Sequence, residues 1–90
     1  MANISAIKKV FHTVTQAEID AFIGFETVLW DSPFYDTNYT VSCLMELPDA
    51  SVGFAILGIS LLTPQGFTVK FSVNGSVGDV ITIHAMASHK

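Results

Sequence analysis

The sequence predicts an all-β protein, a six-stranded antiparallel β-sandwich with one short N-terminal helix. Apolar and polar residues alternate in segments that recur about every ten to twelve residues, as in the strands of small sandwiches. Glycine, proline and asparagine, which favour turns, lie between these segments. One helix-capping pattern occurs near the N-terminus. Because no linker or internal repeat interrupts the 90 residues, we expect a single domain over residues 1–90.

The N-terminal part predicts a strand followed by the helix. Residues 7–14 alternate between two apolar faces, which favours a first strand. Thr15 and Glu18 then have the spacing of a capping box, which predicts a helix over residues 16–23. Gly24 stands where a glycine would end that helix. The apolar residues of the helix lie on one stripe, so we expect it to pack against the sheet or a neighbouring chain.

Two strands and a turn-rich loop are predicted in the middle of the chain. Residues 25–30 and 39–46 alternate with a period of two, which is typical of half-buried strands. The intervening residues 31–38 are rich in aspartate, serine, proline and asparagine, which predicts a loop. A further loop is expected over residues 47–53, because they contain both proline and glycine.

A β-hairpin is predicted around the turn at residues 63–66. Its second arm, 67–73, alternates strictly and should place Phe71 in the core. Gly66 is expected to take the left-handed conformation that leads out of the turn. The first arm, 54–62, is apolar on both faces, so we expect it to be a central strand or to be covered on its second side.

The last strand is predicted over residues 79–87, and its outward face points to self-association. With its isoleucines in the core, this strand presents Val80, Thr82, His84 and Met86 to the outside. The strand at 54–62 adds further uncharged surface. Monomers rarely expose contiguous apolar patches larger than a few hundred Å², so we expect a homo-oligomer.

Composition excludes several partners and compartments. Half of the residues are hydrophobic, 13% are charged and the net charge is −4, with four lysines and no arginine. Nucleic acid and anionic membrane surfaces are therefore poor partners. No run approaches the ~18 apolar residues of a membrane span, so membrane insertion is not expected. The first residues lack the pattern of a signal peptide, which predicts cytoplasmic synthesis, followed by incorporation into a virion or release by lysis. A lone cysteine, Cys43, fits a reducing compartment.

The sequence contains no pattern typical of an enzyme. His12, His84 and His89 lie on different predicted elements, and neither Cys-x-x-Cys nor His-Glu-x-x-His occurs. No serine lies in a nucleophile elbow. We therefore expect no catalytic residue, no metal site, no cofactor and no enzymatic activity.

The loop at 31–38 and its flanks suggest a carbohydrate site. Aromatic rings can cover the C–H faces of a sugar, and carboxylates and amides can bind its hydroxyls. Several of these residues also have a structural interpretation: Trp30 and Tyr39 as core, Asp31 and Asp36 as caps of turns, and His84 as a solvated or interfacial strand residue. The candidate ligand-binding residues are Trp30, Asp31, Tyr35, Asp36, Asn38 and His84.

Short motifs over about residues 25–87 resemble two groups of small β-sandwiches. These motifs are Phe25-Glu26-Thr27-Val28 with Ser32-Pro33-Phe34, Asp36-Thr37-Asn38-Tyr39-Thr40-Val41, Thr63-Pro64-Gln65-Gly66-Phe67-Thr68-Val69 and Ile81-Thr82-Ile83-His84-Ala85. Together they are similar to phage tail-fibre tips and receptor-binding modules, and to the H-type lectin domain. The lectin pattern has tryptophan-alanine where this chain has His84-Ala85, and the helix at 15–23 has no counterpart there.

The resemblance implies an assembled protein and a function. Members of both groups are typically trimers or hexamers of trimers, so it implies a trimer-based homo-oligomer, and the lectins bind sugars at subunit edges. The expected function is a structural or attachment module of a phage-like particle that acts through oligomeric interfaces, with glycan binding as an additional property. The alternative is a carbohydrate-binding protein similar to H-type lectins.

Overall fold

The computed structural model describes residues 5–47 and 54–90 and confirms the all-β class. Six strands form two three-stranded antiparallel sheets, and one short helix is present in the described part. The loop expected over 47–53 lies outside the described residues from position 48 onward. The elements are β1 (Ser5–Thr13), α1 (Gln16–Ala21), β2 (Ile23–Leu29), β3 (Tyr39–Glu46), β4 (Ala55–Thr63), β5 (Gly66–Ser72) and β6 (Val80–His89).

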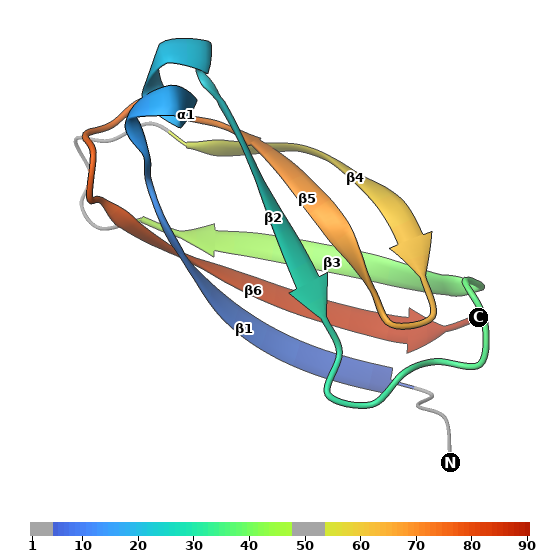
Figure 1. Cartoon of the computed structure of the whole chain (residues 1–90). Helices are drawn as coiled ribbons and strands as arrows, with labels where there is room; N and C mark the ends of the chain where they lie inside the picture. The colour runs from blue at the N-terminus through green and yellow to red at the C-terminus, as the bar shows by residue number, and fades with distance from the viewer. Residues whose placement is uncertain (1–4, 48–53) are drawn as a thin grey trace.

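The two sheets face each other across the core of an elongated molecule (Figure 1). Strand order is β1-β6-β3 in one sheet, here called sheet B, and β2-β5-β4 in the other, sheet C. The principal extents are 41 × 21 × 17 Å, with the strands running along the long dimension. Each sheet therefore has one inner face against the core and one outer face.

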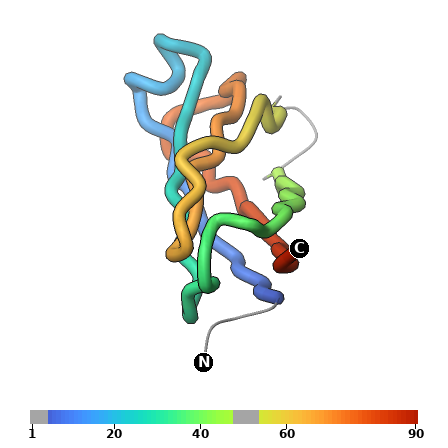
Figure 2. The backbone as a smooth tube through the Cα atoms, turned by 90° about the vertical axis from the view of Figure 1, so that its right-hand side faces the viewer, coloured from blue at the N-terminus to red at the C-terminus, as the bar shows by residue number. Residues whose placement is uncertain are grey.

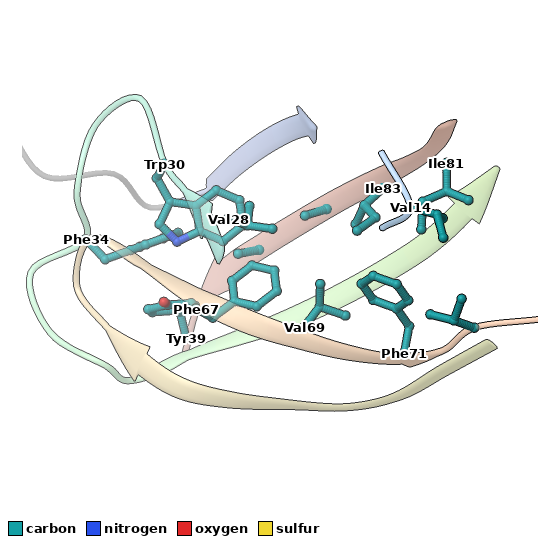
Figure 3. Packing of buried hydrophobic residues seen from close by; sticks show 13 residues of the cluster. Val14, Val28, Trp30, Phe34, Tyr39, Phe67, Val69, Phe71, Ile81 and Ile83 are labelled. Atoms are coloured by element: carbon teal, nitrogen blue, oxygen red, sulfur yellow. The ribbon is translucent and has the colours of Figure 1, made fainter. Parts of the chain in front are cut away.

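The core is built by the period-two alternation of the two middle strands (Figure 3). On β5 the side chains of Phe67, Val69 and Phe71 are at most 1% exposed, which confirms the predicted inward face. On β6 Ile81 and Ile83 are fully buried. The outward face of β6 is only partly as predicted, because Thr82, expected to be exposed, is also buried.

The helix starts as predicted but ends differently. Both hydrogen bonds of the capping box between Thr15 and Glu18 are present. The helix stops at Phe22, which takes the left-handed conformation with φ of 59°, and Gly24 already belongs to β2. The expectation that Gly24 ends the helix is therefore wrong. Glycine is needed there for space, because a Cβ would lie 2.5 Å from the Phe71 ring and 2.6 Å from a Glu18 carboxylate oxygen.

For the hairpin, the expected conformation of Gly66 is wrong, and of the two alternatives for the first arm the central position is wrong, while cover by a neighbouring chain stays a prediction. The strand β4 is an edge strand rather than a central one, and its Leu57 and Leu61 side chains are 55% and 75% exposed. No described element covers its outer face, so the apolar residues of β4 stay accessible in the single chain. Gly66 does not take the left-handed conformation. Its role is close approach, because a Cβ at this position would lie 2.0 Å from the Val28 carbonyl oxygen.

The two long sides of the molecule, where sheet edges meet, differ in chemistry. Along β1 and β2 the edges are joined by ion pairs, Lys8 with Asp31 and His12 with Glu26. Along β3 and β4 the inward side chains are half-buried and apolar, and they pack against the core without charged partners among the described residues; they are Val41, Cys43, Met45, Ile56, Ile59 and Leu62. Of the two long sides, the β1–β2 side is therefore joined by ion pairs and the β3–β4 side by apolar contacts.

Candidate functional site

Five of the six candidate ligand-binding residues lie together at one end of the molecule. The loop at 30–38 joins β2 to β3 at the end opposite α1 (Figures 1 and 2). Trp30 is only 6% exposed and meets Phe34 edge to face at a centroid distance of 5.9 Å. Phe34 in turn stacks on Tyr39 at 4.3 Å. The core interpretation of Trp30 and Tyr39 therefore agrees with the structure.

The loop is anchored to the β4–β5 turn by hydrogen bonds. The backbone N–H groups of Trp30 and Phe34 donate to two carbonyls of the turn at 63–66, with distances of 2.8 and 2.9 Å. The Tyr39 hydroxyl lies 2.7 and 2.9 Å from two further carbonyl oxygens of this turn. These contacts fix the aromatic cluster to the turn, while the Trp30 indole N–H is buried and has no hydrogen-bond partner among the described residues.

The polar residues of the loop stay at the surface. Asp31 pairs with Lys8 at 2.6 Å, and Tyr35 is 71% exposed. Asp36 accepts a hydrogen bond from the Asn38 backbone N–H at 2.8 Å, which is the turn-capping geometry weighed above. An exposed tyrosine ring in a loop with two accessible carboxylates is suited to contact a sugar, and the ligand role of these residues stays a prediction.

Asp36 is also coupled to the C-terminal strand. His89 Nε2 lies 2.8 Å from the Asp36 carboxylate. The Asn38 N–H, followed by His89, lowers the pKa of Asp36, and the Asp36 carboxylate raises the pKa of His89. Both groups are accessible to solvent, so we attribute little folding stability to this pair.

His84 lies apart from the other candidate residues. It belongs to the outer face of sheet B, where its Nε2 is 3.2 Å from Glu46. In the register of β3 and β6, Tyr39 is opposite His89 and Leu44 is opposite His84. Five strand positions separate the two places, which corresponds to roughly 17 Å. The structure therefore does not bring His84 into the site at the loop.

The outer face of sheet B contains two adjoining open hollows. Their volumes are about 480 and 320 Å³, and both are lined by Ile7 and Met86. The larger one also contacts Leu44, with His84 and Glu46 at its polar end. Ile7, Leu44 and Met86 are 79%, 67% and 49% exposed, so they give the larger hollow an apolar centre. The smaller hollow is mixed, because four serine and threonine residues also line it: Ser5, Thr40, Ser42 and Ser88. We call this surface the sheet B face.

The outer face of sheet C differs from the sheet B face in its middle strand, while its edge strands also expose large apolar side chains, those of Phe25, Leu29, Leu57 and Leu61. Its middle strand, β5, presents Thr68, Lys70 and Ser72 outward, and these are polar residues. The middle strand of sheet B presents Met86 and Val80, which are 49% and 44% exposed. The residue pattern predicted the inward side of β5 and, apart from Thr82, the outward side of β6. Only the strand register shows that Ile7 on β1 is opposite Met86 on β6.

A half-buried cluster of three ionisable groups was not predicted from the sequence. His12 Nε2 lies 2.7 Å from a Glu18 oxygen, and His12 Nδ1 lies 2.8 Å from Glu26. Burial alone would lower the pKa of His12, but the hydrogen bonds and charges of Glu26 and Glu18 outweigh it and raise this pKa. The signal in the sequence was weak, because the three residues belong to β1, α1 and β2, which only the fold brings together.

Across residues 5–47 and 54–90, no group of three or more His, Cys, Asp or Glu side chains is arranged to hold a metal ion. Burial raises the pKa of the Cys43 thiol. Within the same residues, no helix has both the length and the apolar character needed to cross a membrane.

Comparison with known proteins identifies a similar fold. No family model matches the chain, and no curated protein matches it. Four chains of solved structures match. One is a C-terminal fragment of the P. aeruginosa R1 pyocin fibre, with a TM-score of 0.58 and 14% sequence identity over 92% of this chain.

The match extends over only part of the fibre. This chain spans 22% of the length of the fibre fragment. At such low identity the similarity shows the fold, and it supports the predicted likeness to tail-fibre modules at that level. The predicted likeness to H-type lectins stays a prediction.

Proposed function

We propose that this chain is a β-sandwich module of a phage-like tail fibre, with a structural or attachment role carried out through contacts between copies of itself. The observation that carries the proposal is the sheet B face, which is hollowed, exposes Ile7, Leu44 and Met86, and is not covered by any of the described residues. Similarity of the fold to a segment of a pyocin fibre supports the same assignment. Exposed apolar patches of this kind usually mark subunit contacts.

The charges around the sheet B face favour a second copy as the occupant. Lys9 lies on β1, at one edge of the face, and Glu46 lies on β3, at the other edge. On the middle strand β6, Lys9 is opposite His84 and Glu46 is opposite Thr82, so the two charged residues are offset by two strand positions. A copy that packs on this face can therefore place its Glu46 near Lys9 while the apolar centres meet. Threefold symmetry, which the resemblance implies, is part of the proposal.

The remaining parts of the proposal follow from composition. A net charge of −4 with four basic residues disfavours nucleic acid as a partner. We propose a non-enzymatic protein without cofactor or membrane insertion, made in a cytoplasm and present in a virion or released by lysis.

Carbohydrate binding is the second candidate function. The observation in its favour is Tyr35, 71% exposed, in the same loop as the accessible carboxylates of Asp31 and Asp36. Tyrosine rings and carboxylates are suitable contacts for sugars. A lectin would use this end of the molecule, about 17 Å from His84 along the strands.

A glycan array distinguishes the two functions. We expect the assembled wild-type protein to bind no glycan, because the structural role needs only contacts between subunits. Binding that is lost in Tyr35→Ala and retained in His84→Gln would contradict this expectation and favour the lectin. His84→Gln is the matched control, since it changes a candidate residue outside the loop.

A further inference from the structure

We propose that His12, Glu18 and Glu26 form a proton-dependent latch, in which the protonated imidazole holds α1 against the β1–β2 edge and loss of the proton releases the helix. The three side chains are 12%, 15% and 27% exposed. They come from β1, α1 and β2, so one imidazole joins the helix to the edges of both sheets. The latch is independent of the proposed function, because it involves neither the sheet B face nor the loop at 30–38.

The geometry requires a charged imidazole. A neutral imidazole has one N–H donor, and its second ring nitrogen is an acceptor. Here both ring nitrogens of His12 face carboxylate oxygens, at 2.8 Å for Nδ1 and 2.7 Å for Nε2. Carboxylates can only accept, so both contacts are hydrogen bonds only when His12 is protonated. Removal of one proton leaves a lone pair against a carboxylate at one of the two nitrogens.

Apart from His12, the attachments of α1 in the described residues are a hydrogen bond from the Val73 backbone N–H to the carbonyl of its C-cap residue Phe22, at 3.1 Å, and one apolar contact. No residue of α1 is buried, and Ile19 is its half-buried apolar contact with the core. Glu18 accepts a hydrogen bond from the Thr15 backbone N–H at 2.9 Å and from His12 as well, so one carboxylate both caps the helix and anchors it. A helix of six residues is too short to be stable by itself in water. Its population therefore depends on this anchor.

The groups around His12 account for its charge. Glu18 faces it from α1, Glu26 from β2, and the Phe71 ring on β5 lies edge-on at 5.0 Å. Asp20, the other acid of α1, is bonded to Gln16 at 2.9 Å. Within the described residues the recorded ion pairs of Glu18 and Glu26 are both with His12. Deprotonation of His12 thus leaves two neighbouring carboxylates without a cation.

The pH range follows from the directions of the pKa changes. The pKa of His12 is raised above its ordinary 6.5, so its contribution is complete below that pH and is lost as pH rises through the raised value. The pKa of Glu18 is lowered from 4.5, since the hydrogen bonds from Thr15 and His12 outweigh its burial. Its contribution is present above 4.5 and is lost as pH falls further. The latch is therefore closed between these pH values and opens on the alkaline side.

An NMR titration of the full chain tests the latch. The ring carbons of His12 report its protonation, and the backbone 13Cα shifts of residues 16–21 report the helix at any pH. From about pH 5 to about pH 9, we expect the helical shifts to decay with the same midpoint as His12. For each unit by which the pKa of His12 in the latched chain exceeds its pKa in the released chain, deprotonation lowers the ratio of helical to released chain tenfold. Retention of helical shifts through the His12 titration would overturn the proposal.

Two variants separate the latch from a general effect of pH. Glu26→Gln removes one carboxylate but keeps a hydrogen-bonding group, so both midpoints should move together to lower pH. His84→Gln removes another strand histidine that pairs with a glutamate, at 3.2 Å, and should leave both midpoints unchanged. A helix midpoint that stays fixed in Glu26→Gln, or that moves in His84→Gln, contradicts the latch.

Discussion

Phe71→Ala is expected to lower the free energy of unfolding by about 3–5 kcal/mol, because it removes a ring from a packed core. Phe71 is fully buried on the middle strand of sheet C and contacts the edge of His12. Urea denaturation at a fixed protein concentration measures the change, since self-association would otherwise alter the apparent stability.

Phe25→Ala is the matched control for this substitution. Phe25 lies on the neighbouring strand β2, but its side chain is 56% exposed on the outer face. The control should therefore lose much less stability than Phe71→Ala. A loss below about 1 kcal/mol in Phe71→Ala would show that the inner face of β5 is wrongly assigned.

Gly66→Ala is expected to lower the free energy of unfolding by about 1–3 kcal/mol or more, as overpacking does. The added Cβ would lie 2.0 Å from the Val28 carbonyl oxygen, so the backbones of β2 and β5 must move apart. The turn at 63–66 also anchors the loop at 30–38, so the strain reaches the aromatic cluster. Thermal unfolding followed by circular dichroism measures the loss.

Gly58→Ala provides the control on the adjacent strand. A Cβ at Gly58 would meet no atom within 4 Å, so this substitution should leave the melting temperature nearly unchanged. If Gly66→Ala had the same melting temperature as Gly58→Ala and the wild type, the close approach of β2 and β5 at this turn would be refuted.

The strands and their faces could be predicted because a period of two is a local property of the sequence. The bounds of β3 agree with the prediction, and Phe67, Val69 and Phe71 point inward as expected. The failures concern contacts between elements. Gly24 and Gly66 were interpreted through backbone conformation, whereas both are required by atoms of other strands that approach them closely.

The candidate site was predictable only where its residues are close in the chain. The loop at 30–38 keeps its residues together, whichever way the sheets pair. The His12 cluster needs β1 and β2 side by side with α1 above them, and the sheet B face needs the register of β1 and β3 on β6. Neither arrangement leaves a pattern in the local sequence. The position of β4 was left open for the same reason, since an uncharged strand can be central or can lie at an edge that another copy covers.

Light scattering coupled to size-exclusion chromatography tests self-association through the sheet B face most directly. We expect the wild type to elute as a trimer of the 9.7 kDa chain. Met86→Lys, at the centre of the sheet B face, should shift the mass to that of a single chain, because it places a charge among apolar contacts. Thr27→Lys on the exposed outer face of sheet C should remain a trimer. A wild type that stays soluble at 9.7 kDa across micromolar dilution would contradict self-association. A dimer would contradict only the threefold symmetry.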